Sequence, residues 1–224
     1  ALALVCGNTL VWKPSEKTTL CAIACNALLC GVLKDLGYSE DISSVVIGGQ
    51  DMAETIADDK RIALVSATGS TAMGRNIGVR TAARFAKTIL ELGGNSATVV
   101  MQSADMDMAL SAVVFGSAGT TGQRCTSLRR VFAHVDIYDE LVKKTIDAFA
   151  RIPLGDPRED GILIGPLIGE ASSDAMDKAL ATAAEQGGIV HGGGRVEVDG
   201  LPEGVYVRPA LVEFKEHSAI MHTE

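Results

Sequence analysis

The chain has 224 residues, a hydrophobic content of 47% and a mean hydropathy of +0.23, enough apolar material for a sheet covered on both faces. Its 20 basic and 28 acidic residues give a net charge of −8 without a basic run, which argues against nucleic acid or an anionic membrane as a partner. Five cysteines without paired spacing favour reduced thiols in an intracellular protein over a disulfide framework.

Strands and helices alternate in the first half of the chain. The apolar runs 5–13, 42–47, 61–66 and 88–92 predict strands. Helices are expected over about 17–36, with Ser15 as its cap and Gly37 as its stop, over 51–58, and from an opening at 68–74 to about residue 85. The apolar stretch 18–33 is shorter than the roughly 20 residues that a membrane span needs.

The alternation continues in the second half. Strands are predicted at 97–101 and 130–135, helices at 107–118, 138–151 and 170–186, a Pro/Gly/Asp-rich loop at 153–166, and short strands at 189–198 and 206–214. This order is typical of βαβ units with a parallel sheet, the α/β class. The glycine pair Gly93-Gly94 is a natural hinge, so we expect two domains, 1–93 and 94–224.

The loop 119–126 (GTTGQRCT) lies between an apolar helix and a strand of this prediction. Its two glycines permit tight turns that place the thiol of Cys125 beside backbone N–H groups. Arg124 adds a fixed positive charge that favours the thiolate. Structural cysteines usually have apolar neighbours, whereas these are polar, so we interpret Cys125 as a reactive thiol, with a space-filling residue as the alternative.

Two stretches at predicted strand ends have the character of nucleotide sites. Gly69-Ser70 begins a helix whose N–H groups and dipole favour a phosphate, although an ordinary Ser-capped helix would have the same sequence. Lys13 and Glu16 follow a strand where open α/β sheets bind nucleotides, and the carboxylate would disfavour a 2′-phosphate, hence NAD over NADP. A solvated charge pair at a helix start is the alternative.

Glu91 ends an apolar strand (TILEL), where burial would raise its pKa toward that of a general base. No histidine lies near the Cys125 loop in sequence, so a base for water in a later hydrolysis step has to come from elsewhere. A carboxylate at an ion-paired strand end is the alternative. The four histidines, at 134, 191, 217 and 222, are interpreted as surface residues.

Three cysteines, Cys21, Cys25 and Cys30, share the first long predicted helix. Their neighbours are Ala, Leu and Ile, and no histidine accompanies them. We therefore expect core packing and no metal site.

In order, the motifs G-N-T-x-V-x-K-P-S-E, T-G-S-x-x-x-G, E-L-G-G and G-Q-R-C resemble those of the aldehyde dehydrogenase superfamily, over essentially the whole chain. Three longer motifs, E-L-G-G-N, G-T-x-G-Q-R-C-T and I-x-H-T-E, are similar to those of the antiquitin branch of this superfamily. Members of that branch oxidise α-aminoadipic semialdehyde in lysine breakdown. Pro157 and the Gly165-Pro166 pair also resemble the family. The resemblance implies part of a Rossmann-type NAD-binding domain at 1–93, followed by part of an α/β catalytic domain at 94–224.

The resemblance also implies a role for each matching residue. Cys125 would be the nucleophile and Glu91 the base that activates water. The cofactor NAD would be bound by Lys13, Glu16, Gly69, Ser70, Leu92 and Glu224. The aldehyde substrate would meet Arg124 and Thr126, Arg124 through a carboxylate at the far end of the substrate.

Some features depart from the family pattern. Ala67 stands where Phe is common, and the P-W-N segment with its oxyanion-stabilising Asn is not in this sequence. We therefore expect the chain to be an internal part of a longer enzyme. We expect that enzyme to be a homotetramer located in the cytoplasm, with the mitochondrion as the alternative location. A general aldehyde dehydrogenase for other semialdehydes and an inactive fragment are the competing interpretations.

Overall fold

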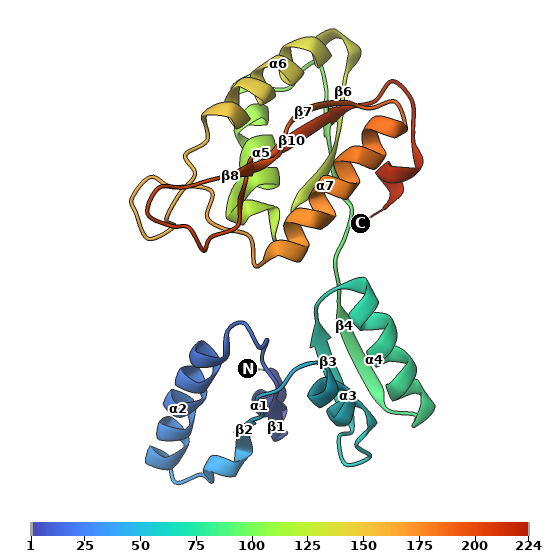
Figure 1. The fold of residues 1–224 in the computed structure, drawn as a ribbon. Coiled ribbons are helices and arrows are strands. Elements are labelled where there is room, and N and C mark those ends of the chain that lie inside the picture. The colour runs from blue at the N-terminus through green and yellow to red at the C-terminus, as the bar shows by residue number, and fades with distance from the viewer. Residues whose placement is uncertain (1, 224) are drawn as a thin grey trace. The chain divides into compact units, whose positions relative to one another are not determined.

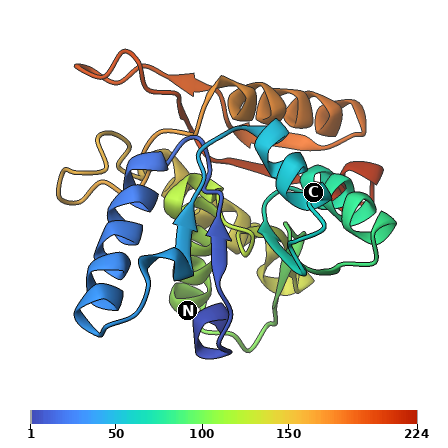
Figure 2. The same cartoon turned by 90° about the horizontal axis from the view of Figure 1, so that it is seen from below.

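The computed structural model describes residues 2–223, and the chain divides at Gly93 into two units, Ala1–Leu92 and Gly93–Glu224 (Figures 1 and 2). Each unit alternates strands and helices, as the α/β prediction requires. The assignment of 1–93 to NAD binding and of 94–224 to catalysis stays a prediction.

The first unit opens with a parallel strand pair and a long helix. β1 and β2 pair from Leu10↔Ser43 to Trp12↔Val45, and α2 contacts β2 (Figures 1 and 2). The predicted strand over 5–13 is wrong in its first half, because residues up to Val5 form a helical turn and Gly7 then reverses the chain at φ +73°. The elements are α1 (Leu2–Val5), β1 (Leu10–Trp12), α2 (Thr19–Asp35), η1 (Glu40–Ile42) and β2 (Ser43–Val45).

The two ends of α2 test the predicted caps. Ser15 does not cap the helix, since its hydroxyl accepts from Lys17 N at 3.3 Å in a preceding turn and Thr18 is the capping residue. The stop at Gly37 is confirmed: its φ is +77°, its N–H bonds Lys34 O, and Tyr38 N bonds Leu33 O. This pair of bonds closes a helix through a left-handed residue, for which glycine has no steric penalty.

Cys21 and Cys25 are exposed on α2, so the prediction that they pack in a core is wrong. Only Ala22 of this helix is buried, and Leu20 is 81% exposed. The helix is apolar around its circumference, so its sequence indicates burial without indicating which side has a partner. Cys30 is half-buried, with its sulfur 3.8 Å from Ser43 O.

The rest of the first unit is a second parallel pair with two helices. β3 and β4 pair from Leu64↔Lys87 to Thr68↔Glu91. Ala57, Val65 and Ile77 are buried between these strands and helices. The elements are α3 (Gln50–Asp58), β3 (Leu64–Thr68), α4 (Thr71–Ala83) and β4 (Lys87–Glu91).

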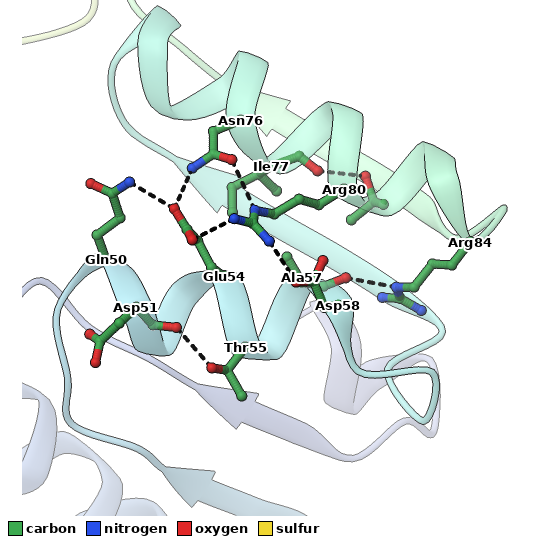
Figure 3. A network of polar contacts seen from close by, with 11 residues as sticks. Gln50, Asp51, Glu54, Thr55, Ala57, Asp58, Asn76, Ile77, Arg80 and Arg84 are labelled. Carbon is green, nitrogen blue, oxygen red and sulfur yellow. Dashed lines mark hydrogen bonds and ion pairs between the residues drawn. The ribbon is translucent and has the colours of Figure 1, made fainter.

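A polar network joins α3 to α4 (Figure 3). The Arg80 guanidinium bonds both Glu54 and Asp58, and Asn76 Nδ2 donates to Glu54 at 2.7 Å. The hydrogen bonds from Gln50 and Asn76, followed by the charge of Arg80, lower the pKa of Glu54, so this carboxylate is ionised at neutral pH. The partners are partly exposed, so the network fixes the helix pairing more than it adds stability.

Phe85 follows α4 in an unfavourable conformation. Its φ is +61°, its N–H bonds Ala82 O, and Ala86 N bonds Thr81 O, the same termination as at Gly37. The side chain is 97% exposed and makes little packing contact. An L-residue in the left-handed region costs about 1–2 kcal/mol, which nothing at this position offsets.

Phe85→Gly should therefore stabilise the first unit by about 1 kcal/mol, the relief of strain being partly offset by the greater freedom of glycine in the unfolded chain. Thermal unfolding measures the effect, with Phe85→Ala as the control because alanine removes the ring and keeps the left-handed cost. Equal stabilisation by both substitutions would show that the ring, and not the backbone, is the destabilising feature.

The second unit combines a parallel pair with antiparallel strands. β5 pairs parallel with β6, β7 antiparallel with β10, and β8 antiparallel with β9. The parallel pairing that was predicted is present in three pairs of the described chain, β1–β2, β3–β4 and β5–β6, whereas the short strands at the end pair antiparallel. The elements are β5 (Ser96–Val100), α5 (Met106–Ala118), η2 (Gly119–Gly122), β6 (Leu128–Ala133), α6 (Val135–Arg151), α7 (Glu170–Glu185), β7 (Ile189–Gly192), β8 (Arg195–Val196), β9 (Tyr206–Val207), β10 (Ala210–Glu213) and η3 (Ala219–His222).

α6 connects the two kinds of strand pair in this unit, because it contacts β6, β7 and β10 (Figure 1). Its Tyr138 donates to Glu213 at 2.8 Å, and His191 Nε2 lies 2.7 Å from the same carboxylate. The hydrogen bond from Tyr138, followed by that of His191, lowers the pKa of Glu213. His191 is thus a half-buried structural residue, not the surface histidine that was predicted.

The core of the second unit lies between the ends of α5 and α6 and the loop that follows. Ala118, Phe149, Ile152 and Ile164 are buried against one another. Within residues 2–223, no helix is both long and apolar enough to span a membrane.

Candidate active site

Cys125 lies in a turn between η2 and β6, and its residue is exposed. The turn is closed by the residues on either side: Arg124 N donates to the buried Ser127 hydroxyl at 3.1 Å, and Ser127 N donates to Arg124 O at 3.0 Å. A Cβ built on Gly94 would lie 3.5 Å from Cys125 O, so the chain that follows Glu91-Leu92-Gly93 passes beside this turn. The thiol is therefore accessible while its backbone is held.

The guanidinium of Arg124 lies over the ring of Phe115, 5.1 Å from the centroid. Within the described chain this guanidinium forms no ion pair with an acidic side chain. Thr126, the other predicted substrate residue, is exposed in the same turn. Both side chains face solvent next to the thiol in sequence.

Lys13 lies where the parallel strands β1 and β2 end. Its Nζ donates to Pro14 O at 2.8 Å and to Gly48 O at 2.9 Å, and lies 3.7 Å from Glu16. A backbone hydrogen bond within Glu16, followed by the charge of Lys13, lowers the pKa of Glu16, which is therefore ionised at neutral pH. The two side chains form a pair at the carboxyl end of the strands, where α/β sheets bind ligands.

Gly69 and Ser70 form the turn between β3 and α4. Ser70 Oγ accepts from Met73 N at 3.1 Å and so caps the helix, and Gly69 N donates to Glu91 O at 3.0 Å. Leu92 packs where a Cβ on Gly74 would lie, with its methyl carbons at 2.5 and 2.6 Å from that position, so only glycine fits there. The first unit thus brings Gly69, Glu91 and Leu92 together at one end of α4.

The side chain of Glu91 is exposed, so the burial expected for it is wrong. In β4 only Leu90 is turned toward the core, and it packs against the cluster of Ala57, Val65 and Ile77. Glu224, a predicted cofactor residue, lies outside the described residues.

Three residues with structural roles near the loop escaped sequence reasoning. Asn95 donates from Nδ2 to Met221 O at 2.7 Å, and its carbonyl accepts from Arg130, so it ties β6 to η3. Thr121 and Gln123 bond the segment 165–168. Asn95 lies in the motif E-L-G-G-N and Gln123 in the motif G-Q-R-C, and these motifs are the sequence signal from which the two residues could have been predicted.

These features define a class: an α/β protein with parallel strand pairs, polar groups at their carboxyl ends and an exposed thiol in a held turn. The model of the aldehyde dehydrogenase family matches residues 1–224, and the chain belongs to that family.

Curated relatives of similar sequence include aldehyde dehydrogenase family 7 member A1 of Malus domestica, 38% identical, and alpha-aminoadipic semialdehyde dehydrogenase of Mus musculus, 39% identical, each over 100% of this chain. The chain spans 43% and 41% of the length of these two relatives.

The fold is also similar to that of solved structures. PnpE in complex with nicotinamide adenine dinucleotide matches with a TM-score of 0.88 at 31% identity, over 98% of this chain and 45% of that one. Lactaldehyde dehydrogenase from Escherichia coli matches with a TM-score of 0.86 at 32% identity, over 96% of this chain and 44% of that one.

Proposed function

We propose that the whole protein oxidises an aldehyde to a carboxylic acid with NAD, and that Cys125 is its nucleophile. The observation that carries the proposal is the exposed Cys125 thiol in a turn whose backbone is fixed on both sides, in a chain of the aldehyde dehydrogenase family. Aldehyde-dependent NADH production by the full-length protein tests it. Full-length protein that binds NAD and leaves a panel of aldehydes unchanged would refute it.

In the proposed reaction, the Cys125 sulfur attacks the carbonyl carbon and forms a thiohemiacetal. NAD, when bound, supplies the hydride acceptor, and loss of hydride from this carbon leaves a thioester on Cys125. Glu91 takes a proton from water, which attacks the thioester, breaks the C–S bond and releases the acid. Two residues separate Glu91 from Gly94 in the sequence, so the covalent chain limits the distance between the Cα atoms of these two residues to about 11 Å.

The residues at the strand ends fit a dinucleotide. Lys13 and Glu16 would hold ribose hydroxyls, and the N-terminus of α4 at Gly69-Ser70 would hold the pyrophosphate. Leu92 and Glu224 complete the proposed cofactor set. An ionised Glu16 would repel the 2′-phosphate of NADP, which favours NAD.

We propose α-aminoadipic semialdehyde as the substrate, by analogy with the relatives that are named after it and are 37% and 39% identical to this chain. This molecule carries a carboxylate at the end opposite its aldehyde. The Arg124 guanidinium, which forms no ion pair within residues 2–223, is suited to bind both carboxylate oxygens, with Thr126 beside it.

Arg124→Ala in the full-length protein should raise KM for α-aminoadipic semialdehyde by about 10- to 150-fold, because a lost charge-assisted hydrogen bond costs roughly 1.5–3 kcal/mol. KM for an uncharged aldehyde such as hexanal should change little. The ratio of the two effects is the measurement. Equal weakening for both substrates would mean that Arg124 acts on the thiol or on the loop, and the anionic substrate would lose its main support.

A general aldehyde dehydrogenase for other semialdehydes is the second candidate, because lactaldehyde dehydrogenase has the same fold at similar identity. A substrate panel on the full-length protein separates the two.

We propose a homotetramer located in the cytoplasm, supported for the location by five cysteines that are all free. Light scattering of the purified protein and localisation in cells test these two points.

A further inference from the structure

The loop that leads to Cys125 has an unusual backbone. Thr120 and Thr121 have φ of 52° and 57°, and Gly122 follows at +66°. Three consecutive residues therefore occupy the left-handed region, two of them β-branched, for which this region is strongly disfavoured. Such a conformation persists only where surrounding contacts hold it.

Two side chains of the loop supply contacts to a distant segment. The Thr121 hydroxyl donates to Gly165 O at 3.0 Å. The amide of Gln123 accepts from Ile168 N at 2.8 Å and donates to Pro166 O at 3.4 Å. The side-chain amide of Gln123 thus both accepts from and donates to the backbone of one segment, as the backbone of a neighbouring strand would. Ile168 in that segment is 45 residues from Gln123 in the sequence.

The segment that receives these bonds is itself anchored. Ile164, immediately before it, is 2% exposed and packs in the core with Ala118, the residue at the end of α5. Ile164 N bonds Pro153 O at 3.1 Å, and Leu167 N bonds Val205 O at 2.7 Å. Residues 165–168, the platform, are therefore fixed on both sides.

We propose that the platform holds the Cys125 loop in its strained form, and that Gln123 and Thr121 are positioning residues for the thiol. The strained turn sets where the chain emerges at Arg124 and Cys125, and Gln123 is the last residue tied to the platform before the thiol. Loss of the hydrogen bonds between Gln123 and the platform lets the loop relax and displaces the sulfur of Cys125. The inference rests on the proposed function for its kinetic consequence, and on the hydrogen bonds alone for its structural part.

The test uses Gln123→Met in the full-length protein, since methionine has a similar length and cannot form either bond. Gln186→Met is the matched control, because Gln186 also accepts a backbone N–H, that of Ile220, at 2.9 Å in the same unit. Gln123→Glu keeps the acceptor for Ile168 N, and Thr121→Val removes the other bond while keeping the β-branch. Amide hydrogen exchange, the rate of the NADH burst and KM for NAD are measured for each.

Gln123→Met should speed exchange at Ile168 and over 120–127 and slow the burst by about 10- to 100-fold, the scale of a misplaced reacting group, with KM for NAD unchanged. Thr121→Val should show the same pattern more weakly, and Gln123→Glu should keep Ile168 protected. Gln186→Met should speed exchange only near Ile220. A burst that Gln123→Met leaves unchanged, or that Gln186→Met slows equally, would overturn the inference.

Failure of the proposed function can be told apart from failure of this inference. Wild-type protein without NADH production from any aldehyde would refute the former. Two measurements would then still test the further inference. One is amide hydrogen exchange over 120–127. The other is the rate at which iodoacetamide alkylates Cys125, relative to the exposed Cys21 and Cys25 of the same molecules. An unchanged Cys125 rate and unchanged exchange in Gln123→Met would refute it.

Discussion

Cys125→Ala is expected to abolish aldehyde oxidation in the full-length protein, with a loss of roughly 10⁴-fold or more in kcat, the scale seen when a covalent nucleophile is removed. Without the sulfur no thiohemiacetal forms, and no carbon is left in a state that can release hydride. The rate of NADH formation with and without aldehyde measures the loss.

The chain offers matched controls for this substitution. Cys21 and Cys25 are also exposed thiols, and they lie on α2 in the first unit. Cys21→Ala and Cys25→Ala should leave kcat unchanged. Turnover by Cys125→Ala at the wild-type rate would show that Cys125 is not the nucleophile. A loss of activity in Cys25→Ala instead would show that the proposal assigns the chemistry to the wrong thiol.

Glu91→Gln is expected to separate the two halves of the reaction. Acylation of Cys125 needs no base for water, so a pre-steady-state burst of NADH should survive. Hydrolysis of the thioester should slow by about 10²- to 10⁴-fold, the usual contribution of a positioned general base. Rapid mixing with NAD and aldehyde measures the burst and the steady state in one experiment.

Glu185→Gln is the control for the charge change, because Glu185 is an exposed carboxylate at the end of α7. It should leave both phases as in the wild type. If Glu91→Gln lowered the burst and the steady state equally, Glu91 would act before or during acylation and not on water.

The fold could be predicted from the sequence where local signals suffice. Gly37 ends α2 because a left-handed residue is required there, and the apolar run before Gly93 becomes β4. Ser15 failed as a cap, since a turn at 15–18 comes first and the helix begins at Thr19. The strand over 5–13 failed because Gly7 reverses the chain inside an apolar run, which periodicity does not detect.

The candidate site was predictable as a set of residues but not as an arrangement. The motif predicts Cys125 as the reactive thiol, whereas the hydrogen bond from Ile168 N to the Gln123 side chain joins positions 45 residues apart, which no local pattern detects. The exposure of Glu91 and Cys25 likewise depends on which sides of β4 and α2 have partners. An apolar neighbourhood in sequence indicates burial only when a second element covers it.

The most direct test of the central claim is mass spectrometry of the acylated enzyme. Full-length Glu91→Gln is mixed with NAD and α-aminoadipic semialdehyde, quenched in acid and digested. We predict a thioester on the peptide that contains Cys125, which adds the mass of the substrate less two hydrogen atoms, forms in proportion to the NADH burst and is absent without NAD. A burst without any adduct on Cys125, or an adduct on another cysteine, would contradict the account.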